Sequence, residues 1–295
     1  MRFEFLGTGT SAGIPTIGCH CAVCTSSDPH DARLRTSGLI RFEDAGGQER
    51  AILIDAGPDL RQQSLRAGLE RLDAILLTHN HVDHTWGLDE VRRFNVLAGG
   101  APIDLWADRH TLDFARRVYQ HIFEPHRNIQ ASFVASLLPR ELRPMEAIDL
   151  FGMIVTPLAL LHGRLPILGF RFDPSRRLSD AIAARTSQSG ASEPWWPLAY
   201  LTDVSGIPPE TWPALSGVRT LVLDALRHRH HPTHYTLDQA VGVAERVGAQ
   251  QTFFVHMSHD LPHRATNESL PDGMRLAHDG LVLGAKESGA EGARE

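Results

Sequence analysis

Thr78-His79-Asn80-His81-Val82-Asp83-His84 follows directly on the apolar run Ala74-Ile75-Leu76-Leu77. A continuous apolar run of this kind is typical of a strand that is buried on both faces of a sheet. The chain therefore leaves the core and turns at the histidines, which places them on a loop at the carboxyl end of a strand. Imidazoles and carboxylates are ligands that borderline divalent ions prefer in proteins.

The spacing within this stretch predicts two metal ions. His79 and His81 are two residues apart and can reach one ion, while Asp83 and His84 point around the turn at a second. A histidine-rich surface loop is the alternative interpretation. The complete pattern between a buried strand and the turn at 86–87 makes that alternative the weaker one.

The length and composition bound the class of protein. The 295 residues are 42% hydrophobic and 22% charged, as in an ordinary globular chain. No stretch approaches the roughly 18 apolar residues needed to span a bilayer, and residues 2–5 begin as a strand rather than as a signal sequence. We expect one domain over residues 1–285, a disordered tail over 286–295, a cytoplasmic location and no membrane partner.

The formal charge of −6 argues against a nucleic-acid polymer as partner. Proteins that bind the phosphate backbone normally show a net basic domain or a stripe of Lys and Arg. A nuclease that processes transfer RNA is disfavoured for the same reason, because no basic arm is evident.

The three cysteines, Cys19, Cys21 and Cys24, lie within six residues. A C-x-C loop is very short for a disulfide bridge, a cytoplasmic chain disfavours bridges, and one thiol would be left over. The spacing instead predicts three thiolate ligands of a structural zinc ion that needs a fourth ligand from elsewhere. Three unrelated thiols are the alternative.

The rest of the chain reads as alternating strands and helices. Residues 111–123 predict one helix whose buried stripe includes Ala115, Val118, Tyr119 and Ile122, and Asp59 is expected to cap a helix that ends at Gly68. A capping box at Thr236 predicts a helix up to Gly248. The composition of 176–197 predicts a flexible linker in which Trp195 and Trp196 pack over a pocket or a partner subunit. Strands are expected at 2–6, 37–42, 51–54, 103–106, 133–138, 153–158, 167–172, 198–202, 220–223 and 251–255.

Several strands deliver a polar side chain at their ends. His162 ends an apolar strand, and a site that holds His79 and His81 still needs a third ligand. Asp203 lies in a tight turn where a carboxylate can bridge two ions, and His256 follows the last core strand. Asp224 is a further candidate ligand.

Two other polar residues are assigned supporting roles. Asp55 also leaves a strand, and we expect it to brace two loops behind the ligands rather than to bind metal. His234 ends the basic loop 227–234 just ahead of a helix N-terminus, where anions are favoured. Whether His228 to His231 contact substrate stays open at this point.

The full pattern resembles the metallo-β-lactamase superfamily of two-metal hydrolases over nearly the whole chain. The residues that carry the resemblance are the 79–84 motif followed in order by His162, Asp203 and His256. Within that superfamily, residues 6–9, the 18–24 cysteine loop, residues 201–206 and the pair His256 and His259 resemble the PhnP-type phosphodiesterases. Those enzymes hydrolyse small cyclic or diester phosphates.

The resemblance implies an α/β fold of αββα four-layer sandwich type. It implies one metal held by His79, His81 and His162, a second held by Asp83, His84 and His256, and Asp203 bridging them. It also implies that His259 completes the thiolate zinc site with Cys19, Cys21 and Cys24. The active-site ions would be zinc or manganese, and the superfamily is compatible with a homodimer.

The expected activity is hydrolysis of a small phosphodiester of the cyclic phosphate or phosphoribosyl cyclic phosphate type. In the expected mechanism a hydroxide held between two ions, about 3.5 to 4 Å apart, attacks phosphorus in line. Asp83 would orient the hydroxide, and His234 would bind phosphate oxygens or protonate the leaving group. A thioester or lactone hydrolase of the same fold, and an iron-dependent oxidoreductase or PqqB-like protein, are the alternatives.

Overall fold

The computed structural model describes residues 1–130, 133–186 and 195–284. Its first sheet has seven strands in the order β14-β1-β2-β3-β4-β5-β6. The bounds are β1 Arg2–Gly7, β2 Ser37–Glu43, β3 Glu49–Ile54, β4 Ala74–Leu76, β5 Ile103–Ala107, β6 Leu137–Glu141 and β14 Val282–Leu283.

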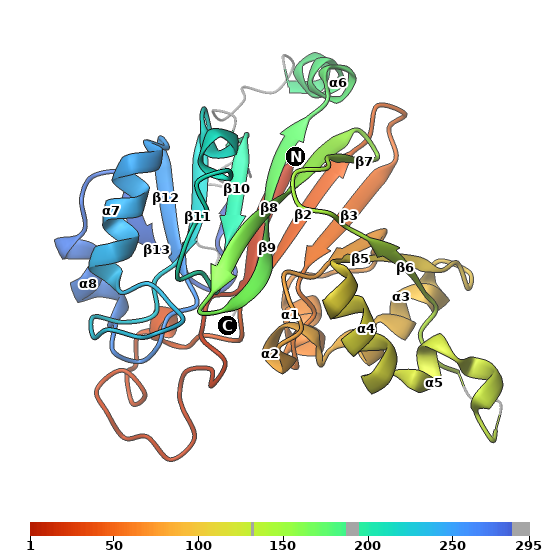
Figure 1. The fold of residues 1–295 in the computed structure, drawn as a ribbon, viewed down its shortest axis with the longest axis horizontal. Helices are drawn as coiled ribbons and strands as arrows, with labels where there is room; N and C mark the ends of the chain where they lie inside the picture. Colours follow the sequence, from red (N-terminus) through yellow and green to blue (C-terminus); the bar gives the residue numbers. More distant parts are fainter. Residues whose placement is uncertain (131–132, 187–194, 285–295) are drawn as a thin grey trace, which may run out of the picture.

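The second sheet also has seven strands, in the order β13-β12-β11-β10-β9-β8-β7. The bounds are β7 Ile148–Leu150, β8 Met153–His162, β9 Leu165–Pro174, β10 Leu198–Leu201, β11 Thr220–Asp224, β12 Gln251–Val255 and β13 Met274–Leu276. Figure 1 shows the second sheet lying against the first, with the long strands β8 and β9 in front.

Helices cover the outer face of each sheet, so the predicted αββα layers are confirmed. Helices α1, α3 and α4 pack on the first sheet, and α7 packs on the second beside α8 (Figure 1). The bounds are α1 Leu60–Arg66, α2 Val82–Thr85, α3 Arg92–Leu97, α4 Arg109–Val118, α5 Gln120–Phe123, α6 Arg176–Thr186, α7 Leu237–Val247 and α8 His263–Ser269.

The layer between the sheets is an aromatic and aliphatic core. Phe3 and Phe5 of β1 face Phe170 and Phe172 of β9 and Phe253 of β12, and all five are buried. The Phe3 and Phe5 rings pack edge to face with their centroids 4.8 Å apart. Aromatic side chains of this size remove the largest apolar areas from water, so they account for much of the attraction between the sheets.

Strand direction determines where the polar strand ends meet. Strands β3 to β6 run parallel in the first sheet, and β10 to β13 run parallel in the second. Strand β8 has the same direction as β10, because both are antiparallel to β9. Parallel strands present their carboxyl ends at one edge, where α/β sheets commonly place their ligands. The polar residues after β3, β4, β8, β10 and β12 therefore converge.

The predicted linker at 176–197 is wrong in its first half. Residues 176–186 form α6, which buries Leu178 and Ile182 against the inter-sheet core. Trp195 is also a core residue, 2% exposed, with its ring centroid 6.0 Å from that of Phe3 and 5.6 Å from that of Trp196. It therefore does not lie over a surface pocket. Residues 187–194 and the predicted tail at 286–295 lie outside the described residues.

Three local predictions differ from the structure. The helix expected at 111–123 breaks at Tyr119 into α4 and α5, and Val118 is 41% exposed rather than buried. The strand expected at 133–138 begins only at Leu137, because Phe133 is exposed. Asp59 makes no side-chain capping bond, since its carboxylate instead pairs with Arg35 at 2.9 Å. The single domain expected over 1–285 stays a prediction.

Among the described residues, every helix is too short or too polar to cross a bilayer.

Candidate metal centre

The first half of the site is a group of three histidines, His79, His81 and His162. Their ring centroids lie 4.5 to 5.6 Å apart, and one ligand nitrogen from each lies within 4.8 Å of the others. His79 and His81 stand on the loop after β4, and His162 ends β8. The Nδ1 atom of His162 lies 2.7 Å from the carbonyl oxygen of Thr233 and donates to it, so Nε2 keeps its lone pair for the site.

The second half consists of Asp83, His84, Asp203 and His256, all buried. Asp83 and His84 lie in α2, a single helical turn, rather than on the loop that we expected. Nε2 of His84 is 3.3 Å from the Asp83 carboxylate and 3.2 Å from Asp203, and Nε2 of His256 is 3.1 Å from Asp203 and 3.6 Å from Asp83. Ligand atoms about 2.0 to 2.1 Å from a tetrahedral ion are separated by roughly 3.3 Å, so this spacing fits a metal ion.

Nitrogen atoms in the site lack the partners that buried polar groups require. Nε2 of His79, His84 and His256 are buried and make no hydrogen bond to the part of the chain that the structure describes. Nδ1 of His84 lies 2.7 Å from Asp55 and donates to it, so the lone pair of a neutral His84 ring faces the carboxylates of Asp83 and Asp203. Acceptors turned toward acceptors require a cation between them. The donor set therefore fits metal ions.

The charges at the site also favour a bound cation. Burial alone would raise the pKa of Asp83, but the imidazoles of His84 and His256 outweigh burial and hold this pKa below its ordinary value. At His84 burial lowers the pKa, while the carboxylates of Asp203 and Asp55 raise it well above the ordinary value. A proton on His84 or divalent ions would both supply the charge that these carboxylates attract.

The histidines of the first group are held neutral. Burial, followed by the charge of His84, lowers the pKa of His79 well below its ordinary value. Burial likewise lowers the pKa of His162 to about 4. Neutral imidazole is the form that binds a metal, so these rings are prepared for ligation at neutral pH.

The backbone is strained at three residues of the site. Asp55, Asp203 and His256 have φ angles of 61°, 56° and 58°, in the left-handed region that residues other than glycine rarely adopt. Each follows the end of a strand, where the unusual turn directs its side chain to the edge shared by the sheets. Strained backbone of this kind is concentrated at functional sites.

Asp55 lies behind the candidate ligands and contacts one of them directly. Its carboxylate accepts hydrogen bonds from Nδ1 of His84 at 2.7 Å and from the backbone N–H of Thr78 at 2.8 Å. The Thr78 hydroxyl lies 2.9 Å from Asp55 and 3.0 Å from Nδ1 of His79. Asp55 therefore fixes the orientation of a ring in each half of the site, one directly and one through Thr78.

Asp224 lies on the far side of two other rings. One oxygen is 2.8 Å from Nδ1 of His234, and the other is 3.8 Å from Nδ1 of His256. The rings of His234 and His256 stack with their centroids 4.8 Å apart, and a nitrogen of His234 lies within 4.8 Å of ligand atoms of His162 and Asp203. His234 thus lies at the centre, and Asp224 contacts it from behind.

A separate group joins the cysteine loop to His259. The Sγ atoms of Cys19, Cys21 and Cys24 lie 3.2, 3.6 and 3.4 Å from Nδ1 of His259. Sulfur and nitrogen ligands of a tetrahedral zinc ion lie roughly 3.5 Å apart, given bonds of about 2.3 and 2.0 to 2.1 Å. These four residues therefore fit a metal ion, in a loop that extends below the sheets in Figure 1.

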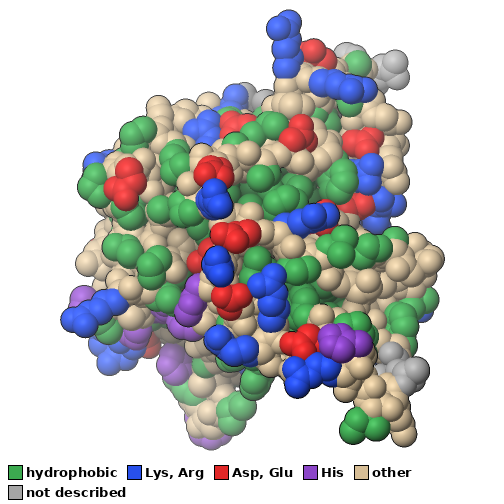
Figure 2. Space-filling model, turned by 45° about the vertical axis from the view of Figure 1, so that its right-hand side comes forward, with side chains coloured by type: hydrophobic (Ala, Val, Ile, Leu, Met, Phe, Trp, Pro, Cys, Tyr) green, Lys and Arg blue, Asp and Glu red, His purple; other side chains and the backbone are tan. Residues whose placement is uncertain are grey.

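The basic loop 227–234 forms one rim of the centre. His231 lies beside His234, with ring centroids 5.1 Å apart, and Arg227 donates to the carbonyl oxygens of Arg229 and His230. His228 and His230 are exposed. Histidine side chains also lie along the lower edge of the face in Figure 2.

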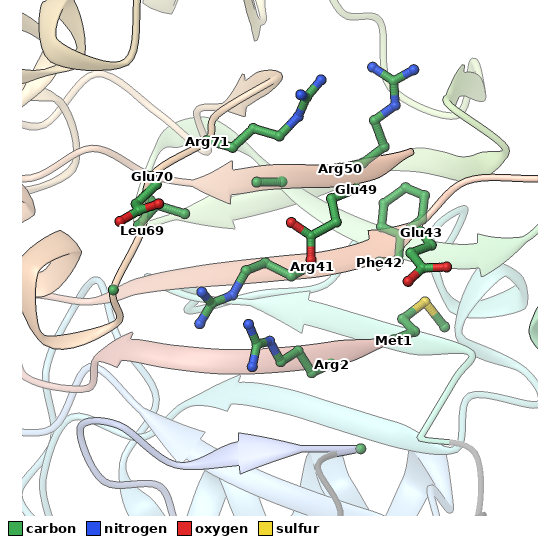
Figure 3. Close-up of a pocket in the computed structure, with 13 residues that line it drawn as sticks. Met1, Arg2, Arg41, Phe42, Glu43, Glu49, Arg50, Leu69, Glu70 and Arg71 are labelled. Carbon is green, nitrogen blue, oxygen red and sulfur yellow. The ribbon is translucent and has the colours of Figure 1, made fainter. Parts of the chain in front are cut away.

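A depression on the described surface lies elsewhere. Its volume is about 550 Å³, and it lies over the outer face of β1 to β3, at the amino end of β3 (Figure 3). Arg41 there pairs with Glu4, and Arg50 pairs with Asp44 and Asp73. The charges balance one another, and the depression holds no cluster of metal-binding side chains among the described residues.

Comparison with known proteins places this geometry in context. A sequence profile described as "Beta-lactamase superfamily domain" matches residues 50–257. The chain is 36% identical over 291 residues to the octanoyltransferase of Porphyromonas gingivalis, which covers 98% of this chain but 52% of that protein. It is 35% identical over 137 residues to the coenzyme PQQ synthesis protein B of Methylobacterium radiotolerans, covering 42% and 43% of the two chains. The chain thus spans about half the length of the first of these relatives.

Two solved structures are similar over nearly their whole length. A diphosphatase of the PhnP family has a TM-score of 0.80 and 43% identity, and the match covers 96% of this chain and 97% of the other. Zinc-bound PqqB of Methylobacterium extorquens has a TM-score of 0.69 and 20% identity, with 97% and 100% covered, and therefore shares the fold.

Proposed function

Because the chain belongs to the metallo-β-lactamase superfamily and, within it, to the PhnP family, we propose that it hydrolyses small phosphodiesters and diphosphates with the help of bound metal ions. Cyclic phosphates of ribose are included in this substrate class. The observation that carries the proposal is the convergence of five histidines and two aspartates at the edge shared by both sheets. The 43% identity to a diphosphatase supports phosphorus chemistry.

The proposed cofactors are two divalent ions, zinc or manganese. His79, His81 and His162 would hold one ion, Asp83, His84 and His256 the other, and Asp203 would contact both. Such a pair supplies Lewis acidity and lowers the pKa of a water molecule toward 7. A third ion, a structural zinc, would be held by Cys19, Cys21, Cys24 and His259.

Two residues are proposed to handle protons. Asp83 accepts a hydrogen bond from the attacking water and orients it toward phosphorus. Burial lowers the pKa of His234 to about 3, so its ring is neutral at physiological pH and shares a single proton with Asp224 through Nδ1. When the shared proton sits on Asp224, Nε2 of His234 carries the N–H of the ring. It can then donate to a phosphoryl oxygen, or pass this proton to the leaving oxygen as the Asp224 proton moves to Nδ1.

The rim charge favours an anionic substrate. Residues 227–234 hold two arginines, four histidines and no carboxylate, in a chain of formal charge −6. A local cationic rim raises the concentration of anions at the mouth of a site. The proposed substrate is therefore a small phosphorylated molecule rather than a nucleic-acid polymer or a membrane lipid, and the proposed setting is a cytoplasmic protein, with a homodimer as its assembly.

Side-by-side rates test the proposal. Purified full-length protein loaded with manganese is given bis-p-nitrophenyl phosphate, a ribose cyclic phosphate, a dinucleoside diphosphate and an octanoyl thioester. We expect turnover of the phosphorus substrates, lost in Asp203→Asn and retained in Asp113→Asn, which changes an exposed carboxylate paired with Arg116. Faster cleavage of the thioester than of every phosphorus substrate would move the function to acyl chemistry.

A second candidate is a PqqB-like role, favoured by the 35% identity to a PQQ synthesis protein over 137 residues. This candidate predicts bound iron and oxygen consumption rather than cleavage of a phosphodiester or diphosphate bond. Elemental analysis combined with an oxygen electrode separates it from the first, because a hydrolase consumes no oxygen.

A further inference from the structure

We propose that residues 256–261 couple the two candidate metal sites, and that Arg33 is the positioning residue that holds this segment in place. The inference rests on the proposed function only in taking both sites to bind metal. It predicts that occupancy of the thiolate site by zinc sets the affinity of the histidine and aspartate centre for its own ions.

Two residues of one short segment serve the two sites. His256 places Nε2 3.1 Å from Asp203 in the central cluster. Three residues later, Nδ1 of His259 lies 3.2 to 3.6 Å from the sulfur atoms of the cysteine loop. The path between the sites is therefore a single stretch of backbone.

That backbone is pinned on both sides. The N–H of Met257 donates to the carbonyl oxygen of Thr8, and the N–H of Thr10 donates to that of Met257, both at 3.0 Å. The N–H of Ser258 donates to the carbonyl oxygen of Leu226 at 2.9 Å. A displacement of His259 can therefore not be absorbed in the segment and must reach its neighbours.

Arg33 binds the far end of the segment. It is 1% exposed, and its guanidinium donates to the carbonyl oxygens of Ser258 at 2.9 Å and Leu261 at 2.6 Å. Asp31 lies 3.6 Å from the same guanidinium and accepts a hydrogen bond from the N–H of His263. Burial lowers the pKa of Arg33 to about 10, so the side chain stays charged at neutral pH. The buried guanidinium therefore uses its hydrogen bonds to hold the conformation of one turn, residues 258–261.

The conformation that these contacts hold is a strained one. His256 has a φ angle of 58°, which a histidine keeps only where its surroundings impose it. Releasing His259 from the cysteines, or removing the donors of Arg33, allows the turn to relax toward ordinary angles. The His256 ring then leaves Asp203, and the central cluster loses a ligand. By linkage, filling either site favours the other by the same factor.

Metal binding can be followed separately at each site. Cobalt bound to thiolates gives a charge-transfer absorption that reports on the cysteine site alone. Free manganese, measured by electron paramagnetic resonance during a titration, reports binding to the oxygen and nitrogen ligands of the centre. The full chain is stripped of metal and titrated with manganese, with and without one equivalent of zinc. We expect about tenfold weaker manganese binding without zinc, within the usual range of coupling between sites.

Single substitutions test which residues carry the coupling between the two sites. Cys24→Ser should weaken manganese binding as zinc omission does. Arg33→Met should weaken it while leaving the cobalt absorption of the thiolate site in place, and Arg33→Lys should restore part of the affinity. Arg41→Met is the matched control, because that arginine also donates to a backbone carbonyl, that of Ala67, but lies away from both sites. Circular dichroism confirms that each variant is folded.

The outcomes are distinct. Equal manganese affinity with and without zinc overturns the coupling, as does a cysteine loop that fails to bind cobalt. An unchanged affinity in both Arg33 variants overturns the role of Arg33, and if they do not fold, the zinc comparison in the unaltered chain decides alone. Coupled binding in a protein that cleaves no phosphorus substrate would remove the proposed function and leave this inference intact.

Discussion

Oδ2 of Asp224 and Nδ1 of His234 lie 2.8 Å apart, with both side chains buried. Burial raises the pKa of the Asp224 carboxyl well above its ordinary value, and burial lowers that of His234. The pair therefore prefers to share one proton as two neutral groups rather than to form an ion pair. In the proposed mechanism, Nε2 of His234 is then the atom that meets the substrate.

Asp224→Asn should slow hydrolysis in a manner that depends on the leaving group. The amide keeps the shape of the carboxyl group but fixes the hydrogen-bonding roles at Nδ1, so proton delivery by His234 is impaired. We expect a loss of about 10² in kcat for an alkyl phosphodiester, within the range for general acid catalysis. For bis-p-nitrophenyl phosphate, whose leaving group needs no proton, the loss should be less than about tenfold. Steady-state rates with both substrates measure this, and equal losses would contradict proton delivery.

Gly57→Ala should disrupt the centre from outside the ligand set. A Cβ at position 57 would lie 2.1 Å from the backbone carbonyl oxygen of Asp83, a separation that requires the backbone to move. The turn after β3 would then push α2, and with it Asp83 and His84, away from Asp203 and His256. We expect at least tenfold weaker manganese binding, together with a loss of about 1 to 3 kcal/mol in unfolding free energy from overpacking.

The matched control for that variant is Gly242→Ala in α7, where a Cβ meets open space. In a helix interior, alanine is favoured over glycine by roughly 0.5 to 1 kcal/mol, so this change should stabilise the fold. Manganese titration and denaturant unfolding of both variants test the pair of expectations. Unaltered metal affinity in Gly57→Ala would show that the loop tolerates the displacement.

His263 should make folding stability depend on pH. Burial, followed by the charges of His30 and Arg33, lowers its pKa from 6.5 to about 4 in the folded protein. Its ring packs on that of His30, with centroids 4.7 Å apart. The unfolded chain therefore binds the proton more readily between pH 6.5 and 4. Stability is lost as the pH falls through this window, with a slope of up to about 1.4 kcal/mol per pH unit from this group.

His263→Gln removes that titration and should flatten the slope. Urea unfolding at intervals from pH 7 to pH 4.5 measures the difference between the variant and the unaltered chain. Zinc is kept in excess, so that ligand protonation in the cysteine group does not contribute. Parallel stability curves would mean that His263 titrates equally in the folded and unfolded states.

The sequence predicted which side chains meet at the site better than it predicted which residues hold them in place. The apolar runs before His79, Asp203 and His256 indicated strands, and parallel strands place their carboxyl ends at one edge, so the meeting of these side chains followed from local pattern. The thiolate group could also be predicted, because its three cysteines lie within six residues of the sequence. The resemblance to a known family supplied His259.

The residues that hold the ligands in place do so through contacts between distant parts of the chain, and a local sequence pattern does not predict such contacts. Nothing near Arg33 indicates that it binds carbonyl groups about 225 to 228 residues away. The hydrogen bond from His162 to the backbone carbonyl group of Thr233 could not be predicted either, because every residue has a carbonyl group. Helix α6 could have been found, since Leu178 and Ile182 are four residues apart and form its buried face. The polar residues around them made the helical spacing of these two apolar residues hard to recognise.

His231→Ala should change substrate preference rather than the chemical step. The ring lies 5.1 Å from that of His234 on the rim of the centre. Burial, followed by the charges of His234 and Arg227, lowers its pKa, so a neutral ring can donate an N–H to an anionic phosphate. A substrate with a second phosphate next to the scissile one should meet this rim, whereas an aryl diester with a single phosphate should not. We expect KM for a dinucleoside diphosphate to rise about tenfold, the cost of one weakened charged hydrogen bond. KM for bis-p-nitrophenyl phosphate, and kcat for both, should stay within about twofold, whereas equal changes in both KM values would place the ring in general binding and remove its role in selection.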